Sequence, residues 1–395
     1  MNDEFYIKRA LRLAAKAHHM TSPNPMVGAV IVKKDRIISE DYHRRPGMPH
    51  AEALVIEKAG EDARGSTLYI NLEPCCHTEK RTPPCTKAII SAGIKEVVIS
   101  IADPNPKVSG KGILGLQQAG IKVRTGFLEK EAKRLNEAYI KYITTGKPFV
   151  ILKIAMTLDG KIATPEGQSK WITSEKARRM VHRFRSNVDA IITAIGTVKA
   201  DNPELTARIK GGRHPLRIVI DPNLEIPINS KILQVPPLTI VVTKKFHSLQ
   251  VNNALSHPFK SPLGKEGYRE VKGGIGGFEN EEKIRILLNK GIQLIEYEGE
   301  RVDLQWLMKR LGEKEITSTL IEAGSSMNAY ALEDGIVDKV IFFIAPKIIG
   351  GKKSFPAVGG ESFRSLEEAY RLKDIRMRRV GEDILIEGYI EKNDR

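Results

Sequence analysis

The chain has 395 residues, of which 41% are hydrophobic and 28% charged, and its formal net charge is +15 at pH 7. This length predicts two domains, each large enough to bury its own core. No apolar run is long enough to span a bilayer and the mixed charges of the first residues are unlike a signal peptide, so we expect a cytoplasmic protein without a membrane partner.

Apolar residues at helical spacing predict a first helix over residues 4–18. The following alternation of strands and helices is typical of a three-layer α/β domain. A break at residues 146–148 (Gly-Lys-Pro) then places the domain boundary near residue 145, which divides the chain into domains 1–145 and 146–395. The predicted strands of the first domain are 26–32, 36–42, 67–72, 95–101 and 121–125, and its further helices are 50–60, 83–92, 112–119 and 129–145.

A second alternation of strands and helices follows at once and predicts a second α/β domain. The segment 245–285 is rich in Gly, Lys, Ser and Pro and has little periodicity, so we expect a long loop or insertion there, without an assigned function. The predicted strands of this domain are 149–155, 188–194, 216–221, 238–243, 292–297, 317–322, 338–344 and 384–391, and its helices are 174–186, 303–312 and 325–334.

All three cysteines lie in one short segment of the first domain, as Cys75, Cys76 and Cys85. An odd number of clustered thiols favours a metal site over a disulfide framework. The His-x-Glu pair of His50 and Glu52 lies upstream, and together these residues follow the signature of zinc-dependent nucleobase deaminases. The sequence therefore predicts zinc held by His50, Cys75 and Cys85, with Cys76 as the alternative to Cys75.

One imidazole and two thiolates leave a tetrahedral zinc with an open position for water, whose pKa falls to about 7. The predicted catalytic role of Glu52 is to carry the proton from this water to the ring nitrogen and then to the leaving ammonia. Side chains two residues apart within a helix point apart, so His50 must stand at the very start of its helix. The alternative is a purely structural zinc site, with His77 or His50 as a fourth ligand.

Four stretches of the first domain resemble the deaminase half of the bifunctional riboflavin-biosynthesis enzymes: NPMVGAVIV, PHAEA, LEPCCH and RTPPC. This resemblance implies a cytidine-deaminase-like fold and the hydrolytic deamination of 2,5-diamino-6-(5-phosphoribosylamino)pyrimidin-4-one. It also implies that Asn24 contacts the pyrimidine, although a turn residue before a proline is the alternative for Asn24. Lys107 and Ser109, in the stretch DPNPKVSG, are candidates for binding the phosphate.

The second domain has no GxGxxG at the start of a βαβ unit, so a Rossmann dinucleotide site is not predicted. It contains instead the dispersed stretches FVILKIAMTLDGKIA, GQSKWITS, HRFRSNVDAI, GTVKADNPELTAR, RIVID, IEAGSSMNAYAL and PKIIGG. Together and in this order they resemble the reductase half of the same enzymes. The resemblance implies a dihydrofolate-reductase-like fold, NADPH as cofactor, and reduction of the ribosyl group to ribityl, giving 5-amino-6-(5-phosphoribitylamino)uracil.

The resemblance also assigns site residues in the second domain. Lys153 and Asp201 are the catalytic candidates, for moving a proton or placing the sugar. Lys244 and Lys245 are candidates for the NADPH 2′-phosphate, with a solvated pair as the alternative. The implied substrate contacts are Ser169, Arg185, Leu205, Arg208 and Glu322. The implied NADPH contacts are Ala155, Trp171, Thr197, Asp201, Gly324, Ser325, Ser326, Met327, Asn328, Ala329 and Tyr330.

The positive charge leaves two further possibilities open, a solvated basic surface and a nucleic-acid deaminase with an RNA-binding part. The latter needs a clustered basic face or stacking aromatic residues, whereas aromatic residues are 6% of the chain and dispersed. A non-catalytic second domain is a third possibility, and the presence of Lys153, Asp201 and Glu322 disfavours it. We therefore predict a bifunctional enzyme with zinc, NADPH and a phosphorylated pyrimidine substrate, no nucleic-acid partner, and a homo-oligomeric state.

Overall fold

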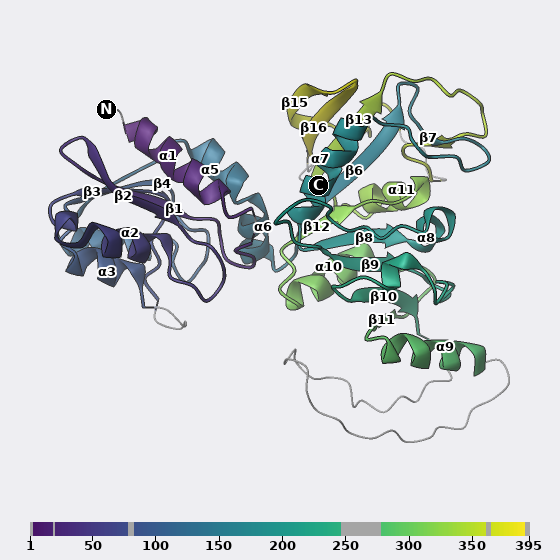
Figure 1. Cartoon of the computed structure of the whole chain (residues 1–395), viewed down its shortest axis with the longest axis horizontal. Helices are drawn as coiled ribbons and strands as arrows, with labels where there is room; N and C mark the ends of the chain where they lie inside the picture. Colours follow the sequence, from purple (N-terminus) through teal and green to yellow (C-terminus); the bar gives the residue numbers. More distant parts are fainter. Residues whose placement is uncertain (1–2, 19, 78–82, 246–277, 361–364, 392–395) are drawn as a thin grey trace.

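A computed structural model describes residues 3–18, 20–77, 83–245, 278–360 and 365–391 of the chain. Two helix-covered sheets follow one another in the sequence, and helix α6 (Glu137–Thr145) lies between them (Figure 1). The predicted α/β fold class is confirmed by this arrangement. No helix within the described ranges is long and apolar enough to cross a membrane.

The first sheet has the strand order β2-β1-β3-β4-β5, in which β1 is antiparallel to both neighbours and β3, β4 and β5 are parallel. Side chains alternate between its faces. Val30 and Val98 pack towards α1, whereas Ile31, Ile70 and Ile99 pack towards α2. The elements are α1 (Asp3–Ala15), β1 (Gly28–Lys33), β2 (Arg36–Tyr42), α2 (Ala51–Ala59), β3 (Thr67–Leu72), α3 (Cys85–Ser91), β4 (Glu96–Ile101), α4 (Lys111–Gln118), β5 (Lys122–Thr125) and α5 (Glu129–Leu135).

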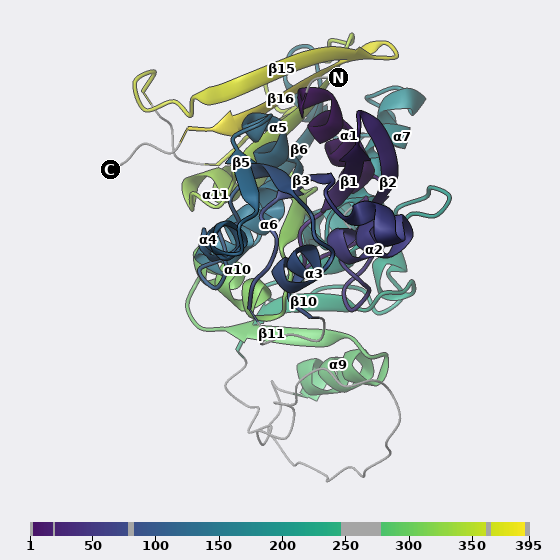
Figure 2. The same cartoon turned by 90° about the vertical axis from the view of Figure 1, so that its left-hand side faces the viewer.

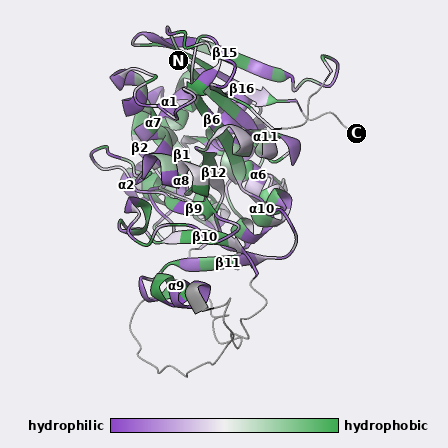
Figure 3. Cartoon of the chain, turned by 90° about the vertical axis from the view of Figure 1, so that its right-hand side faces the viewer, coloured by the Kyte–Doolittle hydropathy of each residue, from purple (hydrophilic) through white to green (hydrophobic). Residues whose placement is uncertain are grey.

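The second sheet has nine strands in the order β11-β10-β9-β8-β12-β6-β13-β16-β15. The seven strands from β11 to β13 are parallel, and β16 and β15 continue the sheet antiparallel. The central strands are largely hydrophobic (Figure 3), as expected where helices cover both faces of a parallel sheet. The strands are β6 (Phe149–Thr157), β8 (Ala190–Ala194), β9 (Leu216–Ile220), β10 (Thr239–Lys244), β11 (Gln293–Tyr297), β12 (Ser318–Ile321), β13 (Lys339–Ala345), β15 (Leu372–Val380) and β16 (Asp383–Ile390).

Helices α10 and α11 contribute to the core on one face of this sheet, and α7 and α9 contribute to the core on the other. Two helix starts follow from capping side chains. The Ser174 hydroxyl accepts a hydrogen bond from Ala177 N, and the Asp303 carboxylate accepts from Gln305 N and Trp306 N. The remaining elements are α7 (Glu175–Ser186), α8 (Ile195–Asp201), α9 (Phe278–Asn289), α10 (Leu304–Glu313), α11 (Ser325–Glu333) and the short pair β7 (Lys161–Ala163) and β14 (Phe355–Pro356).

Several predicted elements were wrong. The expected single helix over 129–145 is two helices that are separated at Asn136. The side-chain amide of Asn136 accepts a hydrogen bond from Met26 N and donates one to Met26 O. The end of the expected loop 245–285 forms α9, while residues 246–277 lie outside the described residues. Helix α8 and strand β15 were not predicted, since α8 is short and nearly all of β15 is exposed.

Candidate functional site

The three predicted zinc ligands lie close together in the first domain, each near the end of a helix or strand. His50 is the N-cap of α2 with extended backbone, Cys75 follows β3, and Cys85 is the first residue of α3. The Nδ1 atom of His50 lies 3.2 Å from Cys85 Sγ and 3.6 Å from Cys75 Sγ. The ligand atoms all lie within 4.8 Å of one another, so one ion can contact all three.

This donor set fits zinc, which binds one imidazole and two thiolates and keeps a fourth position open in catalytic sites. The Sγ atom of Cys76 instead lies 3.9 Å from the Lys107 carbonyl oxygen, which settles the choice between Cys75 and Cys76. Within the described ranges the ligand cluster does not include His77, so the geometry gives no support to a four-ligand structural site.

Glu52 lies in the first turn of α2, two residues after His50, and its side chain faces the same cluster. It is 3% exposed, and its Oε2 atom has no hydrogen-bond partner among the described residues. Burial raises the pKa of Glu52, and the neighbouring Cys75 raises it further, although His50 and a hydrogen bond with Cys85 oppose this. A buried carboxyl group with a free oxygen beside a metal site suits proton transfer.

Asn24 is connected to the zinc ligand His50 by contacts with His43, a residue that was not predicted from the sequence. The side-chain amide of Asn24 lies 3.2 Å from Nε2 of His43, and His43 Nδ1 lies 3.1 Å from the Pro49 carbonyl oxygen. The His43 ring packs edge-on against His50 with ring centroids 5.1 Å apart. Burial lowers the pKa of His43 and favours its neutral form. The only signal in the sequence was its position directly after a predicted strand.

The loop after β4, which contains Lys107 and Ser109, is held by Glu73, another residue not singled out in the sequence. The Glu73 carboxylate accepts hydrogen bonds from Asp103 N at 3.0 Å, Gly110 N at 2.9 Å and Ile113 N at 3.0 Å. A Cβ atom on Gly112 would lie 2.3 Å from the Pro74 carbonyl oxygen, so only glycine fits there. Glu73 therefore fixes this loop beside the cysteines.

In the second domain, Lys153, Arg185 and Glu322 form a buried ion cluster. Lys153 extends from β6, Arg185 from α7, and Glu322 directly follows β12. Glu322 accepts from Arg185 Nε at 2.6 Å and Nη2 at 3.0 Å, and Lys153 Nζ lies 2.8 Å from Glu322 Oε2. Burial alone would raise the pKa of Glu322, but the two cations outweigh it and hold the pKa well below its usual range.

Asp201 belongs to a separate group at the end of α8. Ser169 Oγ donates to Asp201 Oδ1 at 3.2 Å, and Lys170 Nζ lies 3.6 Å from the same oxygen. Trp171 is 64% exposed, and the Arg178 guanidinium lies 4.4 Å from the centroid of its ring. The structure thus brings Ser169 to Asp201, whereas the direct partner of Lys153 is Glu322.

The segment 324–330 begins α11, with Gly324 as N-cap and no capping side chain. Within the described residues, the buried Ser325 hydroxyl has no hydrogen-bond partner. Free backbone N–H groups and an unpaired hydroxyl at a helix start fit an anionic group such as a diphosphate. Thr197 lies beside this turn: its hydroxyl oxygen is 3.9 Å from the point that a Cβ atom on residue 324 would occupy. Ser326 and Tyr330 are exposed, whereas the side chains of Met327, Asn328 and Ala329 are buried.

The other predicted residues of the second domain have different surroundings. Ala155 lies on β6 and packs partly against a core cluster. Leu205 is buried in the core with a left-handed backbone (φ 52°), and Arg208 pairs with Glu204 at 3.1 Å. Lys244 and Lys245 pair with Glu300 and Glu298 at 3.2 and 3.0 Å, which agrees with the solvated-pair alternative.

Comparisons with known proteins cover nearly the whole chain. Residues 148–386 match the RibD C-terminal domain, and residues 1–101 match the cytidine and deoxycytidylate deaminase zinc-binding region. The chain is 41% identical to the riboflavin biosynthesis protein RibD of Aquifex aeolicus, over 97% of both chains. It is 38% identical to RibD of Escherichia coli, over 98% of this chain and 99% of the relative.

Two solved structures agree with the fold over its full length. RibD of Acinetobacter baumannii superposes with a TM-score of 0.82 at 33% identity, covering 99% of both chains. The diaminohydroxyphosphoribosylaminopyrimidine deaminase/5-amino-6-(5-phosphoribosylamino)uracil reductase of Thermotoga maritima gives a TM-score of 0.80 at 35% identity, covering 98% of this chain and 99% of that one. The chain therefore belongs to the RibD family, the bifunctional deaminase/reductases of riboflavin biosynthesis.

Proposed function

We propose that residues 1–145 deaminate 2,5-diamino-6-(5-phosphoribosylamino)pyrimidin-4-one and that residues 146–395 reduce the ribosyl group of the product with NADPH. The final product is 5-amino-6-(5-phosphoribitylamino)uracil. The observation that carries the deaminase assignment is the convergence of His50, Cys75 and Cys85 beside the buried Glu52. The reductase assignment is carried by the family match and by the buried cluster of Lys153, Arg185 and Glu322.

In the deaminase site, His50, Cys75 and Cys85 would hold zinc, which when bound would polarise a water molecule and lower its pKa to about 7. Glu52 accepts the proton that this water gives up when its oxygen bonds to the amino-bearing carbon. Glu52 passes this proton to the ring nitrogen. It then takes the second proton from the oxygen now bound to the carbon and gives it to the leaving amine, so that a C=O bond forms as the C–N bond breaks and ammonia departs. Because Glu52 is buried and its Oε2 atom is not engaged by a described residue, it can serve in both transfers without bulk water.

Substrate recognition in this half is assigned to Asn24 and to the loop that Glu73 holds. The Asn24 amide lies at hydrogen-bonding distance from the buried His43, next to the zinc ligands, and an amide both donates to and accepts from a pyrimidinone ring. Lys107 and Ser109 supply a cation and a hydroxyl for the phosphate. The overall charge of +15 favours such an anionic substrate.

In the reductase site, bound NADPH supplies the hydride. The sugar ring of the substrate must open to an imine. The bond between the anomeric carbon and the ring oxygen breaks, one proton leaves the amino nitrogen on that carbon, and one proton reaches the ring oxygen. Lys153 and Asp201 are the groups proposed to move these protons or to place the sugar. Glu322 holds the Lys153 ammonium in position at 2.8 Å, while Ser169 orients the Asp201 carboxylate at 3.2 Å.

The NADPH side of this site is assigned to the start of α11, with Ala155, Trp171 and Thr197 around it. The uncapped first turn of α11 and the unpartnered hydroxyl of Ser325, among the described residues, suit the diphosphate of the cofactor. The side chains of residues 327–329 are buried, and Asn328 N already donates to the Gly324 carbonyl oxygen, so the start of the turn at residues 324–326 is the part proposed for such contacts.

We also propose that the chain forms a homo-oligomer through β15, the outermost strand of the second sheet (Figure 2). Ile375 and Met377 on this strand are 59% and 71% exposed. Among the described strands β15 has a partner on one side only, and an edge strand with exposed apolar side chains is a favourable surface for a second copy. Sedimentation of the wild type and of Met377→Lys tests this; two species of equal, monomeric mass would refute it.

A coupled assay tests the proposed function directly. The purified protein receives the diaminopyrimidine phosphate, and ammonia and NADPH absorbance are followed together. We expect ammonia release without NADPH, and NADPH oxidation only after deamination. Asp201→Ala should slow NADPH oxidation and leave ammonia release intact. Equal loss of both reactions would contradict two independent sites, and parallel runs with NADH measure cofactor preference.

A further inference from the structure

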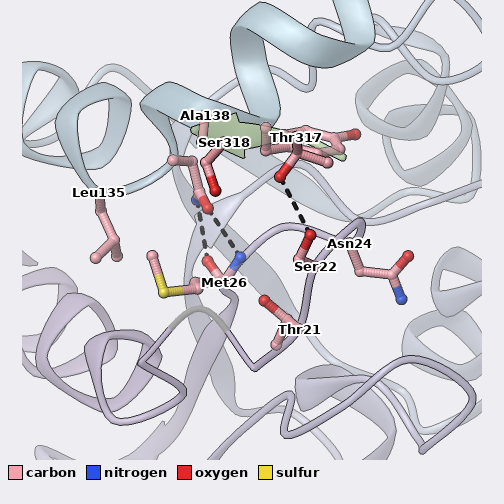
Figure 4. Close-up of a pocket in the computed structure, with 10 residues that line it drawn as sticks. Thr21, Ser22, Asn24, Met26, Leu135, Ala138, Thr317 and Ser318 are labelled. Atoms are coloured by element: carbon pink, nitrogen blue, oxygen red, sulfur yellow. Dashed lines mark hydrogen bonds between the residues drawn. The ribbon is translucent and has the colours of Figure 1, made fainter. Parts of the chain in front are cut away.

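The turn that carries Asn24 is attached to the second domain. The hydroxyl of Ser22 donates to Asp189 Oδ2 at 2.8 Å and lies 3.1 Å from Thr317 Oγ1. Asp189 directly precedes β8 and Thr317 directly precedes β12, so both lie at the amino-terminal edge of the second sheet. Figure 4 shows the contact between Ser22 and Thr317. It lies in a pocket lined by residues 21, 22, 24 and 26, by the junction of α5 and α6, and by residues 317 and 318.

The partner of Ser22 is a rigidly held carboxylate. Asp189 Oδ2 also accepts hydrogen bonds from Thr317 N at 2.8 Å, Thr317 Oγ1 at 2.7 Å and Ser318 N at 3.2 Å. Its other oxygen pairs with Arg213 Nη2 at 2.6 Å. A carboxylate with this many donors has one orientation, and charge-assisted bonds to it are stronger than neutral ones. Ser22 therefore meets a preformed acceptor on the reductase half.

The constraint at Ser22 reaches the metal site through a continuous set of contacts. Asn24 N donates to Thr21 O at 2.7 Å, which places Ser22 inside the same tight turn as Asn24. The Asn24 side chain then lies 3.2 Å from His43, whose ring packs against His50. On the other side of the turn, Met26 is fixed within its own domain, because its N–H donates to Asn136 Oδ1 at 2.8 Å (Figure 4).

We propose that Asp189 and Thr317 of the reductase half are positioning residues for the deaminase half. Through Ser22 they fix the turn that presents Asn24 to the pyrimidine, so the deaminase site is complete only when the second domain is docked. This inference rests on the proposed binding role of Asn24. It predicts that a change at the amino-terminal edge of the second sheet alters deamination more than reduction.

Ser22→Ala in the full-length protein is the direct test, because it removes the interdomain hydroxyl and leaves the other donors to Asp189 in place. The matched control is Tyr142→Phe, which removes another interdomain hydrogen bond, from Tyr142 OH to Gly312 O at 3.3 Å, outside the Asn24 turn. We expect Ser22→Ala to raise the deaminase KM about tenfold while kcat, zinc content and the reductase kinetics stay unchanged. Tyr142→Phe should leave all of these values unchanged. Thr317→Val removes a hydroxyl on the second-domain side of the same contact and should also raise the deaminase KM.

Hydrogen exchange of the peptide containing residues 21–26 provides a readout independent of activity. The Asn24 amide should lose protection in Ser22→Ala but not in Tyr142→Phe. Unchanged exchange and an unchanged KM in Ser22→Ala would overturn the proposal, as would equal effects of both variants. Faster exchange with an unchanged KM would show that Asn24 does not bind substrate and would also overturn it. A wild type that releases no ammonia would refute the proposed function, whereas the exchange result would still report on the interdomain contact.

Discussion

Glu322→Gln tests whether the buried ion cluster of the second domain depends on its single carboxylate. Lys153 and Arg185 are 13% and 15% exposed, and both point at Glu322, which is 8% exposed. At about 2.8 Å and an effective dielectric constant near 20, each pair has a gross Coulomb attraction of about 6 kcal/mol, which desolvation largely offsets. Removing one partner leaves buried cations uncompensated, and this typically costs about 3–5 kcal/mol.

Urea unfolding measured by tryptophan fluorescence isolates this effect, because both tryptophans, Trp171 and Trp306, lie in the second domain. With a urea m-value of about 2 kcal/mol/M, the midpoint should fall by about 2 M. Glu300→Gln is the control: it removes the carboxylate of an exposed ion pair with Lys244 and should leave the midpoint unchanged. Equal midpoints for the two variants would refute the reasoning, since the cluster would then not need its negative charge.

Three further predictions concern the first domain. Glu52→Gln should reduce ammonia release by about 10²-fold or more while one zinc stays bound per chain; loss of zinc in elemental analysis would instead make Glu52 a ligand. Cys85→Ser should lose zinc and Cys76→Ser should keep it, because the Cys85 sulfur belongs to the ligand cluster and the Cys76 sulfur does not; zinc kept in Cys85→Ser and lost in Cys76→Ser would contradict this ligand set. Burial raises the pKa of Asp103 from 3.8 to about 6, so the folded chain binds this proton more tightly than the unfolded chain. The free energy of unfolding should therefore decrease as the pH rises from about 4 to about 6, by up to about 3 kcal/mol. Asp103→Asn should remove that fall, and urea midpoints at pH 4 and pH 7 that change as in the wild type would contradict this.

The zinc site could be predicted from the sequence because its ligands stand at points where the local structure is readable. A histidine before a helix, a cysteine after a strand and a cysteine at a helix start have positions fixed by their own elements. What the sequence left open was the choice between Cys75 and Cys76, since adjacent residues in a loop share the same pattern. Their side chains point to different neighbours, and only tertiary structure shows which sulfur approaches His50.

The candidate residues of the reductase half came from family motifs, and these motifs did not indicate how the residues are grouped. Lys153, Arg185 and Glu322 come from three elements far apart in the chain, and no periodicity indicates that they meet. Strand β15 was missed for a related reason. It is almost entirely exposed, so it lacks the alternation of buried and exposed side chains by which a strand is recognised.

Residues that hold the sites, rather than form them, were the least predictable. Glu73 accepts hydrogen bonds from three backbone N–H groups of the segment 103–113, which begins thirty residues later in the chain. Asp189 accepts a hydrogen bond from a serine 167 residues earlier. Each is a single carboxylate in a sequence with 48 acidic residues. Their distinguishing property is the number of donors that converge on them, and this exists only after the chain has folded. Because a carboxylate buried among several donors has a single orientation, these two residues can fix the segments that we propose to bind substrate. A substitution at either should therefore weaken substrate binding before it affects the metal, which is the opposite order from a substitution of His50 or Cys85.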